Sequence, residues 1–150
     1  MPWLREHWYS SDADTTNWGK QAFASMTLVL RSRLTVPENA ALSPIWPVKY
    51  PSRFERDALY GNLFLPCRGT ANSPLRVRLV NVHLDSLPIN PSLRPHQLSI
   101  VTKYLRTVGH GLVAGEINPV IPDNDTLVGA NNLLDGWCEL RPSEAGSTWS

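Results

Sequence analysis

Two apolar runs of the sequence end in polar side chains that could do chemistry. The first ends at Val82 and is followed by His83; the second passes through Val113 and continues to Glu116 and Asn118. A carboxylate can bind a hard cation or take a proton from water, while an amide and an imidazole can hydrogen-bond phosphoryl oxygens as charge builds. His83, Glu116 and Asn118 are therefore candidate catalytic residues for metal-assisted attack on phosphate, and Glu116 is also the candidate metal ligand.

The segment between the two runs has the pattern of one helix. Apolar residues recur at helical spacing from Leu98 to Val108, after Pro91 and before Gly109. A strand, helix, strand unit joins parallel strands by a crossover of nearly fixed hand, so both strands end at one edge of the sheet. We expect His83 and Asn118 at that edge, within reach of one phosphate-sized ligand.

Each of these residues also has a purely structural interpretation. A single histidine at a strand end is commonly structural, and Glu116 and Asn118 have the character of ordinary polar loop residues. Only their joint placement, strand end against strand end, favours the functional interpretation. Arg94 and Gln97 at the start of the helix are expected to fix it against these strand ends.

The remaining segments predict a mixed α+β chain. The expected elements are a short strand at residues 7–9, a polar turn at 12–19, a buried strand at 23–30, a long connection without helix or central strand at 37–51, an antiparallel pair at 59–65 and 75–83, and a short helix at 131–140.

The order of the motifs resembles a known family. His83-Leu84-Asp85-Ser86 follows an apolar strand, Ala-Gly-Glu-Ile-Asn occupies 114–118, Leu-Asp-Gly-Trp occupies 134–137, and an aromatic segment lies at 3–12. This order is similar to the endonuclease/exonuclease/phosphatase superfamily, with its deoxyribonuclease I-like fold, and within it to the tyrosyl-DNA phosphodiesterase 2-like branch. The resemblance implies a partial deoxyribonuclease I-like β-sandwich with flanking helices, with residues 1–150 forming a single, incomplete domain.

The resemblance also implies an activity. Members of the family are metal-dependent phosphodiesterases or nuclease-type hydrolases, so the implied substrates are nucleic-acid ends, as in DNA repair, or related phosphodiesters, and the implied cofactor is Mg²⁺ or Mn²⁺. In that account Glu116 stands in for the family's aspartate, His83 and Asn118 stabilise the pentavalent phosphorus, and Arg56 matches an arginine that contacts substrate.

Three departures from the family pattern support an alternative. Glu116 is one methylene longer than the aspartate of the motif, which shifts the carboxylate by roughly 1 Å, so Glu116→Asp is expected to raise activity. The Gln-Glu pair of an early strand is absent, and the closing Ser-Asp-His motif would lie beyond residue 150. The alternative is a catalytically inactive fragment or pseudoenzyme with only a structural or binding role.

Composition adds expectations about partners and location. A formal net charge of +1 gives no general pull on nucleic acid, so any contact must be local; Arg53, Arg76 and Arg78 are further candidates to line a phosphate path beside Arg56, against a simple solubilising role. The sequence shows neither a secretory leader nor a membrane span, so we expect an intracellular protein of nucleus or cytoplasm, with no membrane partner.

Other residues predict structure rather than chemistry. Cys67 and Cys138 are expected to be reduced, half-buried thiols, and most of the six tryptophans are expected in the core. His96 and His110 are expected at the surface. Missing strands would leave sheet edges open, so self-association through those edges is expected.

Overall fold

The computed structural model describes residues 2–11, 24–35, 40–67, 73–118, 126–144 and 146. A five-stranded sheet has the order β3 (Ala41–Leu42), β5 (Asp57–Leu65), β6 (Leu75–His83), β7 (Gly111–Glu116), with β4 (Trp46–Lys49) also paired to β5. A separate two-stranded sheet joins β1 (Trp8–Ser10) to β2 (Leu28–Leu30).

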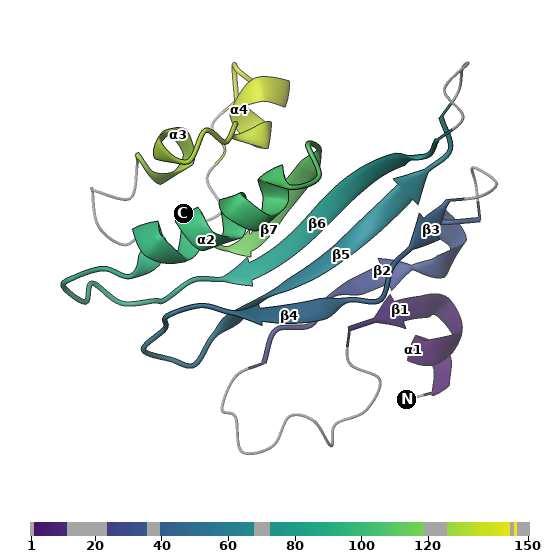
Figure 1. Ribbon diagram of the computed structural model, residues 1–150, viewed down its shortest axis with the longest axis horizontal. Coiled ribbons are helices and arrows are strands. Elements are labelled where there is room, and N and C mark those ends of the chain that lie inside the picture. Colours follow the sequence, from purple (N-terminus) through teal and green to yellow (C-terminus); the bar gives the residue numbers. More distant parts are fainter. Residues whose placement is uncertain are drawn as a thin grey trace.

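Helices lie on either side of this main sheet (Figure 1). Helix α2 (Arg94–Arg106) covers one face, with α3 (Leu127–Ala130) and α4 (Gly136–Leu140) beyond it, while α1 (Pro2–His7), β1, β2 and the short helix η2 (Arg31–Arg33) lie on the other side. This is an α+β architecture, as expected from the sequence. No helix in the described ranges is long and apolar enough to cross a bilayer.

The long hairpin of β5 and β6 is the centre of the sheet. The two strands pair antiparallel from Ala58 opposite Val82 to Leu65 opposite Leu75, which confirms the pair expected from the sequence. Tyr60 and Val80 are opposite one another and are both almost fully buried. Alternate residues of a strand face opposite sides of the sheet. In β6 buried and partly buried residues alternate from 77 to 83, whereas in β5 all residues from 58 to 62 are buried; Ala58 and Tyr60 join Val80 and Val82 in the core cluster.

Helix α2 packs on that core face. Leu98 and Val101 are 1% and 0% exposed and belong to the same buried cluster as Val80 and Val82. The chain then returns as β7, which runs parallel to β6 with His83 opposite Glu116. The expected strand, helix, strand unit is confirmed, and it is this unit that brings the two strand ends to one edge.

The proline-rich segment at 37–51 is not the plain connection expected from its composition. Two short strands, β3 and β4, pair with β5 within the described part of it. Pro47 lies in β4 opposite Leu59. An edge strand needs backbone donors on one side only, so a proline can occupy a position whose N–H would face away from the sheet.

Three other elements are shorter than the sequence predicted, or begin at a later residue. The buried strand at 23–30 is reduced to Leu28–Leu30, and the short strand near residue 8 begins only after α1. Of the helix expected at 131–140 only α4 (Gly136–Leu140) forms, because the Asp135 carboxylate accepts hydrogen bonds from Trp137 N and Cys138 N and so begins the helix there; α3 ends before this range, at Ala130. The polar turn expected at 12–19 lies outside the described residues.

The tryptophans contradict the expectation of a tryptophan core. Trp3 and Trp137 are 55% and 46% exposed, and Trp46, like Trp8, is only partly buried; the other two lie outside the described residues. Tyr50 and Tyr60 supply the buried aromatic volume instead. Both cysteines are free thiols as expected, but they are exposed rather than half-buried.

Candidate functional site

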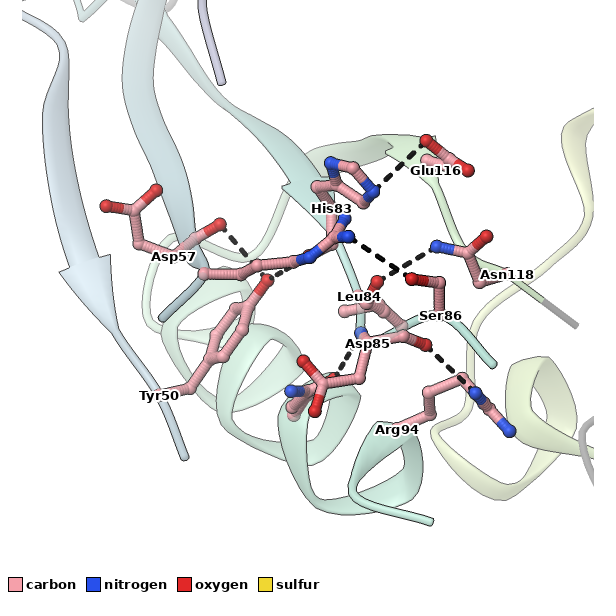
Figure 2. A network of polar contacts seen from close by, with 11 residues as sticks. Tyr50, Asp57, His83, Leu84, Asp85, Ser86, Arg94, Glu116 and Asn118 are labelled. Carbon is pink, nitrogen blue, oxygen red and sulfur yellow. Dashed lines mark hydrogen bonds and ion pairs between the residues drawn. The ribbon is translucent and has the colours of Figure 1, made fainter. Parts of the chain in front are cut away.

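The candidate site begins with a direct contact between His83 and Glu116. Nε2 of His83 lies 3.2 Å from Oε2 of Glu116, across the last register pair of the parallel strands β6 and β7 (Figure 2). The His83 side chain is 25% exposed and the Glu116 side chain 53%. The two residues that the sequence placed at separate strand ends therefore form one imidazole–carboxylate pair open to solvent on the Glu116 side.

The surroundings of His83 favour the neutral form of its imidazole. Burial lowers the pKa of His83 below its ordinary value of 6.5, the nearby Arg56 charge lowers it further, and Glu116 and Asp85 oppose the shift. The Glu116 carboxylate lies on the Nε2 side of the ring, so this contact favours the tautomer that carries its proton on Nε2. In that tautomer Nδ1 carries the lone pair, which makes His83 a candidate base beside a carboxylate that can orient its ring.

Asn118 lies at the same edge but turns its amide back onto the chain. Its Nδ2 donates to the carbonyl oxygen of Leu84 at 2.9 Å, and its backbone has φ of +53°. The Leu84 N–H in turn donates to the Glu116 carbonyl at 2.9 Å. One of the two amide N–H groups of Asn118 is therefore committed to holding the two strand ends together.

Arg56 reaches the site from the segment before β5. Its Nη2 donates to Ser86 Oγ at 3.2 Å, and its charge is close enough to His83 to lower the pKa of that imidazole. The site thus combines a cation, Arg56, and an anion, Glu116, whose charges both act on His83. The structure brings all four candidate residues to one edge, while their chemical roles stay predictions.

Asp85, which carried no chemical role in the sequence interpretation, anchors the loop beneath the site. Its carboxylate is 4% exposed and accepts from Ser52 Oγ at 2.5 Å and from the Arg53 N–H at 2.9 Å. Burial by itself raises the pKa of Asp85, but these hydrogen bonds, with Gln97 and the Arg56 charge, hold it below 3.8. In the sequence, the apolar neighbour Leu84 is a signal that Asp85 follows a buried run. In the structure Leu84 is 0% exposed.

Tyr50 is a second residue that sequence analysis missed. Its hydroxyl lies 2.9 Å from the His83 carbonyl and 3.0 Å from the Asp57 carbonyl, both of which can accept from it (Figure 2). Burial, followed by the Asp57 charge, raises the pKa of Tyr50 far above its ordinary value of 10. Tyr50 is therefore a permanent donor that fixes the backbone of His83.

Arg94 and Gln97 fix α2 against the strand ends, as expected. Arg94 Nη1 donates to the carbonyl oxygens of Asp85 and Leu87 at 2.9 and 3.0 Å. Gln97 Oε1 accepts from the Asp85 N–H, and its Nε2 donates to the Pro51 carbonyl at 2.9 Å. Both side chains are almost fully buried. Arg94 Nη1 and the Gln97 amide hold residues 85–87 and Pro51 against α2, while Nε and Nη2 of Arg94 are buried with no hydrogen-bond partner among the described residues.

Arg78 does not line a phosphate path. It is 5% exposed, and its guanidinium donates to Asn62 Oδ1, to the Tyr104 carbonyl and to Thr107 Oγ1. Those contacts tie the hairpin to the end of α2, which is a structural role. Arg53 and Arg76 are exposed, as are His96 and His110.

The described residues do not fit a divalent metal. Nowhere in the described ranges do three His, Cys, Asp or Glu side chains form a group that could hold an ion. Glu116 lies against His83, 3.2 Å from its Nε2, and the Asp85 carboxylate accepts hydrogen bonds from Ser52 and Arg53. A hard cation needs several oxygen ligands held together, so we derive no step through a metal.

Titration of His83 predicts how stability depends on pH. The folded pKa lies below 6.5 and the unfolded pKa near 6.5, so within that window the unfolded chain binds more protons. The free energy of unfolding should therefore fall as pH drops below about 6.5, and level off below the folded pKa. Urea unfolding at a series of pH values should show this slope in the wild type and a flatter one in His83→Gln; equal slopes would contradict the assignment.

Comparisons with known proteins agree with the fold. No protein-family model matches the sequence, and no curated protein matches it. A solved structure does: TDP2 of D. rerio, described as complexed with single strand DNA product, with a TM-score of 0.57 and 16% identity, over 95% of this chain and 53% of that chain. The chain spans about half the length of this neighbour, and at this identity the likeness shows the fold alone, a partial deoxyribonuclease I-like fold.

Proposed function

We propose that this chain is a nuclease-type phosphodiester hydrolase whose site is the edge formed by His83, Glu116 and Arg56. The observation that carries the proposal is the 3.2 Å contact that makes His83 a carboxylate-oriented base at the carboxyl end of β6. Open sheets with such crossovers bind ligands at that edge. The fold neighbour, crystallised with single-stranded DNA, makes nucleic acid the substrate class to test.

The chemistry follows from the two charges that flank His83. In this proposal Nδ1 of His83 takes the proton from the attacking water, while Glu116 holds the ring and stabilises the imidazolium that forms. The Arg56 guanidinium neutralises charge that develops on the phosphoryl oxygens. The remaining amide N–H of Asn118 can donate to the same oxygens. Magnesium dependence stays a prediction, which the assay tests by comparing added Mg²⁺ with chelator.

The test uses a single-stranded DNA oligonucleotide and a nitrophenyl phosphodiester. Arg56→Met should weaken binding and cleavage by roughly tenfold to a hundredfold, because a charge-assisted contact to an anion contributes about 1.5 to 3 kcal/mol. The matched control is Arg76→Met, an exposed arginine on the same sheet, placed seven residues before His83 and so roughly 23 Å away. It should change neither quantity by more than about twofold.

A second candidate, binding without turnover, is favoured by one specific observation. No group of three metal-ligating side chains is found in the part of the chain that the structure describes. DNA binding that depends on Arg56, with no cleavage in either Mg²⁺ or chelator, would support this candidate against the hydrolase. Neither binding nor cleavage would overturn both.

A further inference from the structure

Strand β7 is the last strand of the main sheet in the part of the chain that the structure describes. It pairs with β6 on one side, and no other strand of the described part of the chain pairs with its far side (Figure 1). Its residues are exposed except for Val113, which is partly buried, and Leu112 is 57% exposed although it is a large apolar residue. Open apolar edges of this kind pair readily with another strand.

The hydrogen bonds to β6 show which backbone groups of β7 face outward. His110 and Glu116 accept bonds from Arg78 N and Leu84 N on the β6 side. Since alternate residues of a strand direct their backbone groups to opposite sides, Gly111, Val113 and Gly115 present theirs to the open edge. An added antiparallel strand must therefore place its own outward-facing residues opposite these three.

The faces of β7 impose a second condition. Leu112 and Ala114 line an apolar groove of about 370 Å³, together with residues of β2 and of β6 such as Leu28 and Leu79. Val113 lies on the opposite face, packed against the core cluster beneath α2. A partner strand extends the apolar face of the groove only if it offers apolar residues at the positions opposite Leu112 and Ala114.

We propose that β7 pairs antiparallel with β7 of a second copy of this chain, with Val113 opposite Val113 on the two-fold axis. This register places Gly111 opposite Gly115, so all the outward-facing backbone groups are paired. It also places Leu112 opposite Ala114 of the second copy, which joins the two apolar grooves on one face of a continuous sheet. The proposal goes beyond the proposed function and does not depend on it.

Charge distribution selects the second copy as the occupant. The same register puts His110 opposite Glu116 of the second copy, at both ends of the paired segment. Both side chains are exposed, Glu116 by 53%, and an imidazole opposite a carboxylate can donate a hydrogen bond to it. Registers centred on Leu112 or Ala114 leave an outward-facing residue unpaired and lose this complementary pair.

Sedimentation velocity over a concentration series tests the dimer. The wild type should show a monomer–dimer equilibrium. Leu112→Lys should raise the dimer dissociation constant by about tenfold or more, because a lysine on an edge strand opposes strand pairing. His110→Glu should also raise it, because it sets like charges opposite each other. The matched control is Leu134→Lys, at a leucine that is 79% exposed outside the sheet; it should leave the equilibrium unchanged.

Cross-linking tests the register even if a lysine variant fails to fold. In a background with Cys67→Ser and Cys138→Ser, mild oxidation of a mixture of the Leu112→Cys and Ala114→Cys chains should give a heterodisulfide, because directly opposite residues lie within disulfide range. Each variant alone should cross-link far less. A wild type that stays monomeric at every concentration, equal effects of Leu112→Lys and Leu134→Lys, or efficient cross-linking of Leu112→Cys with itself would each overturn the proposal.

Discussion

Replacing His83 by asparagine is expected to lower phosphodiester cleavage by about a hundredfold to ten-thousandfold, since this is what a positioned general base contributes. His83 is the one base of the described site that a carboxylate orients, through the 3.2 Å contact with Glu116. Asparagine keeps polarity and approximate size but cannot take a proton at neutral pH. The measurement is the initial rate on a nitrophenyl phosphodiester, with His96→Asn, at an exposed histidine on α2, as the control.

The same pair reverses the expectation for Glu116→Asp. From the sequence, a shorter side chain was expected to restore the family's geometry and raise activity. In the structure the Glu116 carboxylate lies 3.2 Å from His83 Nε2. Aspartate would withdraw the carboxylate by roughly 1 Å and lower the rate by about a hundredfold. Activity of Glu116→Asp above that of the wild type, or unchanged activity in His83→Asn, would contradict the role given to this pair.

Gly115→Ala is expected to lower the free energy of unfolding by about 3 kcal/mol or more. Gly115 has φ of +125°, which L side chains rarely adopt. An added Cβ would also lie 2.1 Å from the Val82 carbonyl oxygen and 2.9 Å from Asn81 Oδ1. To relieve this steric overlap, β7 would have to move away from β6 next to the site.

Urea unfolding of purified variants measures this effect. Gly129→Ala is the matched control, because nothing lies within 4 Å of its added Cβ and no unusual φ is involved. Gly129 lies in α3, where alanine is favoured over glycine by up to about 1 kcal/mol. The control should therefore be neutral or slightly stabilising. A Gly115→Ala chain as stable as Gly129→Ala would show that the β6–β7 pairing is not as close as described.

Local patterns were sufficient for the elements that carry the site. The apolar runs at 59–65 and 75–83 predicted the β5–β6 hairpin, and helical spacing predicted α2. Because a crossover of this kind has nearly one hand, these predictions also placed His83 and Glu116 at one edge. Periodicity within a segment, together with chain connectivity, contains that information without any knowledge of distant contacts.

The tertiary structure alone determined the features that depend on contacts between segments far apart in the sequence. Arg78 resembles an exposed strand arginine until Asn62 and the end of α2 surround it. Proline suggested a loop at 37–51, yet an edge position of the sheet accommodates Pro47. Asn118 turns its amide to Leu84, and Glu116 reaches His83, because of where two strands end relative to each other. Burial and pairing of this kind are properties of the assembled chain, so residue type and spacing predicted where the site lies, while packing determined which atoms in it are free to act.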